Sequence, residues 1–379
     1  MSPFPALAFI GEYGGYGEGK NASTSLIINW QTVGQGDYSK DELEYREKGV
    51  GEWKKVSAED IFVLDEMKRT RKQRYVALDD LDPDTVYEVK FYDGRVNEYK
   101  TLPSTLGEIK ILMTSDVSPR GSGLEEDLRK GILKQLDPDM ILFAGDVGHC
   151  SIDPPKNWES FWNGWLSYSH DSEGKSLPII VSYGNHDTKG GYMKQFFPQV
   201  KGTSFGYVDV GDYLTLLFLD SHHIVETYHQ NAYIETLLTS KSNRLVIPFF
   251  HGSPYAATTD PAREMDKDPR NYLPRQHWTP IFTAHDNVKF VFTGHIHTYG
   301  YSPKVTGDEL DENGKVYFGQ GRSFGMPHRP LISEDVWFVE KTGSQKHVWL
   351  LTLNEHQAIM QSYGIDDGNL IDEVVFSLS

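Results

Sequence analysis

The amino-acid sequence predicts an all-β sandwich followed by a layered α/β domain, and three observations lead to this prediction. Residues 1–103 consist of short segments in which apolar and polar residues alternate, without the spacing of a helix. In residues 104–379, strand-like segments alternate with polar loops and helix-like segments. These later strand-like segments are continuously apolar, which indicates that both faces of their sheet are covered. We therefore place a domain boundary at Leu102-Pro103-Ser104, with domains of residues 1–103 and 104–379.

Six segments of the first domain are expected to be strands, because turns rich in Gly, Asp and Pro separate them. They are residues 25–32, 41–49, 51–58, 74–81, 85–94 and 97–103.

The second domain is expected to contain six buried strands and at least two helices. The strands are residues 107–116, 140–146, 177–185, 213–220, 244–251 and 287–295. The helices are residues 123–136 and 157–168, and Asp137-Pro138 would end the first of them.

Five of these apolar strands end in side chains that are able to bind a metal ion. These residues are Asp116, Asp146, Asn185, His251, and the pair His295 and His297. In an α/β sheet, ligands bind beyond the carboxyl ends of the strands, so residues far apart in sequence meet there. A lone aspartate after a strand is commonly a turn residue, and a lone histidine is commonly structural. Five such strand ends in succession favour a metal site over five separate structural explanations.

The pattern resembles the calcineurin-like metallophosphoesterase superfamily, and within it the purple acid phosphatase branch. The residues that carry the resemblance are Asp116-Val117-Ser118, Gly145-Asp146-Val147-Gly148-His149, Gly184-Asn185-His186, Ile247 to His251, and Gly294-His295-Ile296-His297. The resemblance implies that the second domain is a four-layer α/β/β/α metallophosphoesterase domain.

The N-terminal domain resembles a fibronectin type III module, which often precedes the catalytic domain in this branch. Trp30 and the run from Leu81 to Tyr87 carry this resemblance. It implies that the Tyr87 hydroxyl bonds to the backbone near Leu81 and Pro83.

Carried over motif by motif, the resemblance implies two metal ions, drawn from iron, zinc or manganese, with the pair left open. The first would be held by Asp116, Asp146, His149 and His297, and the second by Asp146, Asn185, His251 and His295. Asp146 would bridge them and partly neutralise two cations that lie about 3.5–4 Å apart. The neutral imidazole and amide ligands would keep the site net positive for a phosphate.

One ligand departs from the family pattern, because His149 occupies the position of a metal-binding tyrosine. A phenolate favours ferric iron, whereas a neutral imidazole suits zinc, manganese or ferrous iron. A divalent ion is the weaker Lewis acid, so its bound water ionises at higher pH. We therefore expect a colourless enzyme with a neutral to alkaline optimum; the alternative is that His149 points away from the site.

The function that the resemblance implies is hydrolysis of a phosphoester by metal-bound hydroxide, with a phosphomonoester as the expected substrate. His186 follows Asn185 and is the candidate catalytic residue, for protonation of the leaving group or stabilisation of charge. Its alternative role is structural support. No substrate-binding residue is assigned, and His222-His223 are either incidental loop residues or substrate contacts.

Two other functions remain open at this stage. A phosphodiesterase, including one for nucleotides or cyclic nucleotides, would use the same metal clamp. A non-enzymatic fibronectin-like binding protein with a structural metal domain is the second alternative. The complete set of ligands argues against it.

The composition of the chain limits which binding partners and which cellular compartment are expected. The net charge of −17 argues against nucleic acid or an anionic membrane as a partner and leaves a small phosphoester substrate; the oligomeric state stays open. No segment approaches the roughly 20 apolar residues of a membrane span, and no signal peptide is visible. Cys150 is the only cysteine, so the sequence favours a cytoplasmic over a secreted protein. Asn21-Ala22-Ser23 fits a glycosylation sequon, which matters only in a secretory pathway.

Overall fold

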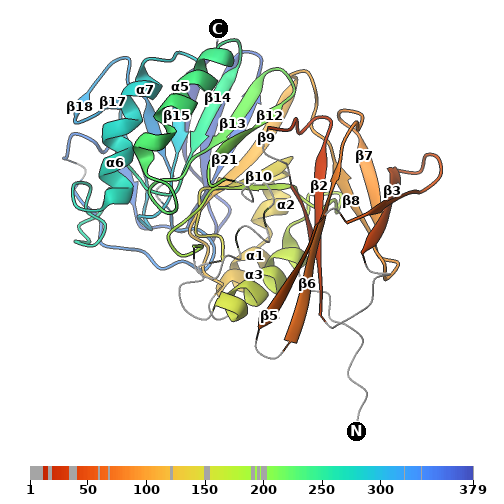
Figure 1. The fold of residues 1–379 in the computed structure, drawn as a ribbon. Helices are drawn as coiled ribbons and strands as arrows, with labels where there is room; N and C mark the ends of the chain where they lie inside the picture. The colour runs from red at the N-terminus through yellow and green to blue at the C-terminus, as the bar shows by residue number, and fades with distance from the viewer. Residues whose placement is uncertain are drawn as a thin grey trace.

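In the part of the chain that the structure describes, two large β-sheets, one of ten strands and one of seven, form the framework (Figure 1). The computed structural model describes residues 12–15, 19–33, 41–58, 60–66, 69–119, 123–148, 154–188, 193, 197, 203–319, 321–333 and 335–378.

The centre of the ten-stranded sheet is parallel. It consists of β9 (Glu108–Thr114), β10 (Met140–Phe143) and β11 (Ile179–Val181). On one side of them follow the antiparallel strands β21 (His347–Asn354), β22 (Gln357–Gly364) and β23 (Leu370–Ser377). Every residue of β10 and β11 is buried, as their continuous apolar sequences predict.

Helices α1 (Gly123–Arg129), α2 (Ile132–Leu136) and α3 (Pro154–Tyr168) belong to the connections between these parallel strands. Aromatic side chains join α3 to the sheet. The ring of Phe143 on β10 lies edge-on to Phe161 at 6.3 Å and to Trp165 at 5.0 Å between ring centroids. Such pairs contribute about 0.5–1.5 kcal/mol each beyond their burial.

The seven-stranded sheet also has a parallel centre, made of β13 (Leu214–Phe218), β14 (Leu245–Phe249), β15 (Phe290–Phe292) and β19 (Val316–Phe318). Its edges are antiparallel: β12 (Gly206–Val210) on one side, β16 (Tyr299–Tyr301) and β20 (Lys341–Gly343) on the other. A small hairpin, β17 (Val305–Thr306) and β18 (Glu309–Leu310), stands apart from both sheets.

Helices α5 (Asn231–Ser240), α6 (Pro269–His277) and α7 (Thr279–Thr283) cover the outer face of the seven-stranded sheet, and a 3-10 turn, η4 (Thr227–Gln230), precedes α5 (Figure 1). The alternation of side chains along β13 explains why both of its faces are buried. Leu216 and Phe218 join the larger core shared with the ten-stranded sheet, whereas Leu217 and the following Leu219 pack in the core beneath the helices.

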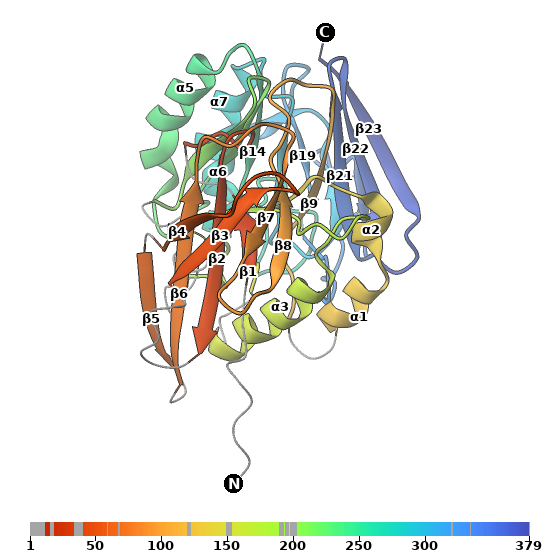
Figure 2. The same ribbon diagram turned by 90° about the vertical axis from the view of Figure 1, so that its right-hand side faces the viewer.

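The N-terminal strands divide between two sheets (Figure 2). One is a separate sheet in the order β4 (Lys54–Ser57), β3 (Glu42–Glu47), β7 (Val86–Lys90) and β8 (Val96–Lys100). The other four strands, β1 (Glu12–Gly15), β2 (Leu26–Val33), β6 (Arg69–Leu78) and β5 (Asp60–Glu66), extend the ten-stranded sheet. The connection is a parallel pairing of Gly15 on β1 with Ile179 on β11. The two sequence regions therefore share one sheet.

Two local expectations have clear outcomes. The backbone N–H of Asp82 donates a 2.8 Å hydrogen bond to the Tyr87 hydroxyl, which confirms the predicted tyrosine contact at this corner. The single helix expected over residues 123–136 was wrong, because the chain breaks into α1 and α2 at Lys130-Gly131. Gly131 has φ of 80°, a left-handed conformation that a continuous helix does not allow.

Asn21 links the N-terminal region to the seven-stranded sheet. Its side-chain amide donates to the Gly211 carbonyl, and the Gly211 N–H donates back to the Asn21 side-chain oxygen, both at 3.0 Å. These two bonds give the Asn21 side chain a structural role in this segment. Of the helices that the structure describes, none combines the length and apolarity that a membrane span needs.

Candidate metal centre

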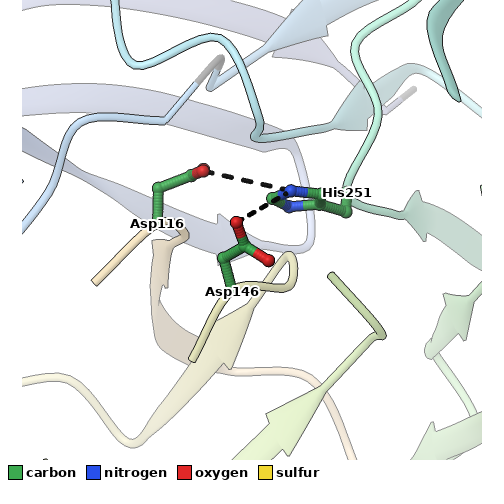
Figure 3. Close-up of side chains that lie close together, drawn as sticks. All are labelled: Asp116, Asp146 and His251. Carbon is green, nitrogen blue, oxygen red and sulfur yellow. Dashed lines mark ion pairs between the residues drawn. The ribbon is translucent and has the colours of Figure 1, made fainter. Parts of the chain in front are cut away.

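The carboxyl ends of strands from both large sheets meet at the candidate metal centre. From the ten-stranded sheet come the residues after β9, β10 and β11, namely Asp116, Asp146 and Asn185. From the seven-stranded sheet come the residues after β14 and β15, namely His251, His295 and His297. Figure 3 shows Asp116 and Asp146 pointing toward the ring of His251.

Two carboxylates and one imidazole form the core of this cluster. Ligand atoms of Asp116, Asp146 and His251 all lie within 4.8 Å of one another. His251 Nε2 is 3.3 Å from Asp146 Oδ2 and 4.0 Å from Asp116 Oδ1 (Figure 3). His297 Nε2 lies 3.1 Å from the same Asp116 oxygen. All four side chains are nearly or fully buried, so their charges are poorly screened by water.

The orientation of His251 indicates that a cation belongs at this point. Its Nδ1 lies 2.9 Å from the Ala144 carbonyl oxygen, which only accepts, so Nδ1 carries a proton. When the ring is neutral, Nε2 therefore carries no proton and has a free lone pair. That lone pair faces the Asn185 side-chain oxygen and His295 Nδ1, each at 3.1 Å, as well as the Asp146 carboxylate. Several acceptors facing one another are mutually repulsive unless a cation or a proton lies between them.

The charges of the site shift the proton equilibria of its members. Burial lowers the pKa of His251, but the Asp146 and Asp116 carboxylates outweigh it and raise this pKa to about 9. Burial raises the pKa of Asp116, and His251 and His297 outweigh it, so the pKa of Asp116 lies below its ordinary value. Burial, aided by the charge of His251, keeps the pKa of His295 well below its usual range. His295 is therefore a neutral imidazole, the form that binds metals.

Four of the candidate ligands have left-handed backbone conformations. The φ angles are 54° for Asp116, 51° for Asp146, 76° for His295 and 60° for His297. This conformation costs a non-glycine residue on the order of 1–2 kcal/mol, and it persists where the surrounding structure enforces it. Such strain gathers at functional sites, which supports a shared role for these four residues.

Two glycines of the motifs are required by close packing against the aspartates. A Cβ atom at Gly184 would lie 2.1 Å from the Asp146 backbone nitrogen and 2.2 Å from its Oδ1. A Cβ atom at Gly294 would lie 2.6 Å from Asp116 Oδ2. The space that these glycines leave empty is what allows the strand ends to converge.

Two further aspartates support the centre, and neither is among the site residues predicted from the sequence. Asp268 caps the first turn of α6, and His295 Nε2 donates to its carboxylate at 2.8 Å, which directs His295 Nδ1 toward His251. Asp187 accepts the backbone N–H groups of Val147, Gly148 and Gly184 at 3.2–3.3 Å. Burial and the nearby Asp146 raise the pKa of Asp187 to about 7. Asp187 directly follows the Gly-Asn-His motif, so its position was a usable signal, whereas no motif marks Asp268.

The candidate catalytic residue His186 lies beside the centre in a different setting. Its backbone N–H donates to Asp146 Oδ1 at 2.8 Å, and its Nε2 is 3.9 Å from Asp146 Oδ2. Its side chain is 19% exposed, whereas that of Asp146 is 1% exposed. His186 is therefore placed to reach both the centre and solvent. His149, the seventh predicted ligand, lies outside the residues that the structure describes.

A hollow of about 260 Å³ opens beside the centre. It is lined by Asn185, Thr188, His222, His223, Pro269 and Arg270. The His223 ring lies 5.6 Å from that of His251 between centroids, so the histidine pair found in the sequence borders the site. Burial, together with the charge of His251, keeps the pKa of His223 well below its ordinary value, so this ring is neutral.

The donor set fits metal ions of intermediate softness. It offers two buried carboxylates, one amide oxygen and three imidazoles from the described residues, which is the combination that zinc, manganese and ferrous iron accept. His251 Nε2 lies in the middle of this set, 3.1 Å from both the Asn185 side-chain oxygen and His295 Nδ1.

Comparisons with solved structures show relatives of this fold. In fold, the chain is similar to PhoD, with a TM-score of 0.67 and 10% sequence identity, over 100% of this chain and 94% of that one. It is also similar to GAP50, described as the anchor in the inner membrane complex of Plasmodium, with a TM-score of 0.54 and 12% identity, over 72% of this chain and 90% of that one. None of the curated proteins matches the chain in sequence.

The family model for calcineurin-like phosphoesterases matches residues 109–299, which is half of the chain and includes β9, β10, β11, β13, β14 and β15. All six described candidate ligands lie within the matched residues. The protein therefore belongs to the calcineurin-like phosphoesterase family and is a metal-dependent phosphoester hydrolase.

Proposed function

We propose that this protein hydrolyses small phosphomonoesters at neutral to alkaline pH, with two metal ions. The observation that carries the proposal is the position of His251 Nε2, which lies 3.1 Å from both the Asn185 side-chain oxygen and His295 Nδ1 and 3.3 Å from the Asp146 carboxylate. Calcineurin-like phosphoesterases use divalent metals, and this arrangement of donors is suited to them.

Two overlapping ligand sets follow from the motifs. One metal would be held by Asp116, Asp146, His149 and His297, and the other by Asp146, Asn185, His251 and His295. The contact of His297 Nε2 with Asp116 supports the first set, and the contacts of His251 with Asn185 and His295 support the second. Asp146 belongs to both sets and would be shared by the two metals, and its carboxylate lies 3.3 Å from His251 Nε2.

The chemistry divides between the metals and the side chains of the chain. When bound, the metal ions supply a nucleophile from water and positive charge for the phosphoryl oxygens. His186 donates a proton to the leaving-group oxygen or a hydrogen bond to the charge that develops there. Its partial exposure and its proximity to Asp146 support this role. Asp268 keeps His295 in the tautomer that presents Nδ1 to the centre.

The identity of the metals follows from His149. An imidazole in place of a phenolate favours zinc, manganese or ferrous iron over ferric iron. A divalent pair keeps the attacking group protonated to higher pH than a ferric centre does, which places the optimum at neutral to alkaline pH. A divalent metal pair and a neutral to alkaline optimum would distinguish this protein from the acid phosphatases of the purple branch.

A paired assay tests the function. The full-length protein, loaded in turn with zinc, manganese and iron, is given 4-nitrophenyl phosphate and bis(4-nitrophenyl) phosphate over a range of pH. We expect a higher kcat/KM for the monoester and an optimum at or above neutral pH. A reversed preference would identify a phosphodiesterase, and no turnover of either ester with any metal would overturn the proposal.

The architecture proposed with this function has two domains, residues 1–103 and 104–379. A fibronectin type III-like sandwich is supported by the separate sheet β4-β3-β7-β8, by the facing strands β1, β2 and β6, and by the Tyr87 contact. The buried Trp30 packs edge-on to Phe91 at 6.3 Å between these two sheets. A four-layer α/β/β/α catalytic domain is supported by α1–α3 on one large sheet and α5–α7 on the other (Figures 1 and 2).

A further inference from the structure

Asp268 joins the metal centre to an arginine. Its carboxylate, 1% exposed, accepts 2.8 Å bonds from His295 Nε2 and from Arg270 Nη2, and a 2.6 Å bond from Arg270 Nε. The Arg270 backbone N–H also donates to it at 3.1 Å, which caps α6. One buried carboxylate therefore fixes a candidate metal ligand and a guanidinium at the same time.

The orientation of Arg270 leaves one edge of its guanidinium available. The guanidinium has two parallel pairs of donors, and Asp268 uses the pair made of Nε and Nη2. Within the part of the chain that the structure describes, Nη1 forms no hydrogen bond and no ion pair. The side chain is 24% exposed. The free edge, Nη1 with the second proton of Nη2, is suited to two oxygens of a phosphate.

Arg270 and the candidate metal ligand Asn185 line the same hollow of about 260 Å³. The six residues that line it, all of them described, include no carboxylate, although the whole chain carries a net charge of −17. The hollow is therefore a locally favourable place for an anion. Its volume is at the lower end for small-molecule sites, which favours a phosphoryl group with a small leaving group.

We propose that Arg270 binds the third terminal oxygen of a phosphomonoester, and that Asp268 is the positioning residue that orients Arg270 and His295 together. This inference rests on the proposed function for the place of the phosphoryl group. Two metals bind two phosphoryl oxygens, and a monoester has a third terminal oxygen that a diester lacks. Arg270 therefore selects monoesters.

The first test measures binding of inorganic phosphate to the full-length, metal-loaded protein by titration calorimetry. We expect Arg270→Met to raise the dissociation constant about 10-fold or more, with metal content unchanged, and Arg270→Lys to recover part of the loss through its charge. Lys267→Met is the matched control, because Lys267 is an exposed cation on the same segment, paired with Glu264. An affinity of Arg270→Met within twofold of the wild type, or an equal loss in Lys267→Met, would overturn the proposal.

The second test separates positioning from general structural support. Asp268→Asn keeps a side chain that caps α6, so the helix start is retained while the ion pair is lost. We expect it to weaken phosphate binding about as much as Arg270→Met when both are measured at saturating metal. The double variant should bind no more weakly than Arg270→Met alone at saturating metal, because Asp268 acts on the phosphate through its ion pair with Arg270. If the dissociation constant for phosphate rises in the double variant by the product of the two single effects, the positioning role is excluded.

Turnover distinguishes this inference from the proposed function. Arg270→Met should lower kcat/KM for 4-nitrophenyl phosphate by about 10-fold or more and change that for the diester by less than threefold. A protein that hydrolyses neither ester but loses phosphate affinity in Arg270→Met would refute the proposed function and keep Arg270 as the anion-binding residue. An active protein with unchanged phosphate affinity in Arg270→Met would refute this inference alone.

Discussion

His186 and the candidate ligands differ in exposure, and that difference fits the separate roles proposed for them. The candidate ligands among the described aspartates and histidines have side chains that are 0–6% exposed, whereas that of His186 is 19% exposed. A proton donor to a leaving group must exchange its proton with solvent, whereas a metal ligand needs no such access.

We predict that His186→Ala lowers kcat about 10²-fold or more, because a lost general acid has an effect of this size. Metal content, measured by mass spectrometry, should stay at the wild-type level. His186→Asn serves as the companion variant, since it keeps a hydrogen-bond donor and should recover part of the activity. Loss of metal in parallel with activity would show that His186 is a ligand instead.

The metal preference is predicted to depend on His149. The wild type should be colourless, and His149→Tyr should gain a visible absorption band when loaded with ferric iron, because phenolate binds that ion in a charge-transfer complex. The pH–rate profile of the variant with iron should shift toward acid, since a ferric ion is the stronger Lewis acid. An intense visible band and an acidic optimum in the wild type would contradict this prediction.

We predict that His347 makes the unfolding free energy of the protein fall as the pH is lowered. It is 3% exposed and lies edge-on to Tyr299 at 5.1 Å between centroids, and burial lowers its pKa to about 4. Between pH 6.5 and 4 the unfolded chain therefore binds a proton that the folded protein does not, and stability falls as pH falls. At about 1.4 kcal/mol per pKa unit, the loss on reaching pH 4 is about 3 kcal/mol.

Chemical denaturation at pH 7 and pH 4 measures this effect. His347→Gln cannot take up the proton, so the difference in unfolding free energy between the two pH values should shrink by about 3 kcal/mol. His356→Gln, at an exposed position on the turn between β21 and β22, is the control and should leave the difference unchanged. An identical pH dependence in wild type and His347→Gln would exclude the buried imidazole as its cause.

The site residues that stand in sequence motifs could be predicted from the sequence, and the others could not. Asp146 and His295 stand in short patterns with glycine neighbours, and the structure brings them together with the other described candidates. Asp268 and Arg270 were missed because they act through a helix start that lies far from every motif. In the sequence, Asp268 looks like any other aspartate that caps a helix. Only the fold shows that it also contacts His295 and Arg270.

Among secondary-structure elements, the segment before β2 makes a connection that no local pattern indicates. Asn21 pairs with Gly211 at the turn between β12 and β13, and a parallel bridge joins it to Asp209. We predict that Asn21→Ala lowers the free energy of unfolding by about 1–3 kcal/mol, because it removes the acceptor of the Ser23 backbone N–H and one of the two partners of both the Gly211 N–H and the Gly211 carbonyl. Thermal or urea denaturation measures the change.

Thr24→Ala is the control for this segment, because the Thr24 side chain is exposed on the same turn, and it should change the unfolding free energy by less than about 0.5 kcal/mol. Equal stability of Asn21→Ala and the wild type would show that the two bonds to Gly211 contribute nothing net.

The existence of an element was predicted well where periodicity is strong, whereas its boundaries and breaks were predicted poorly where single residues decide. The apolar runs of β9 to β11 and the aromatic spacing of α3 were found from the sequence. The break at Gly131 depends on one glycine adopting a left-handed conformation, which an otherwise helical pattern conceals. The pairing of β1 with β11 joins residues more than 160 positions apart, and sequence periodicity carries no information about such partners.

Across the whole molecule, the candidate metal centre is the point where the two large sheets are tied together. Asp116, Asp146 and Asn185 come from one sheet, and His251, His295 and His297 come from the other. A metal bound here belongs to the folded state alone, since the unfolded chain does not hold these residues together. Metal binding should therefore stabilise the association of the two sheets as well as the local site.

We predict that removing the metals with a chelator lowers the melting temperature of the whole protein. At a metal concentration 100 times the dissociation constant, binding contributes about 2.7 kcal/mol to the unfolding free energy, and chelation removes it. Because the ligands span both sheets, calorimetry should show the main transition shifting as a unit instead of a new early transition. Asp146→Asn is the matched control: without the bridging carboxylate, its melting temperature should respond neither to added metal nor to chelator. A wild type that loses its metals, by elemental analysis, without any change in melting temperature would show that the centre does not couple the sheets.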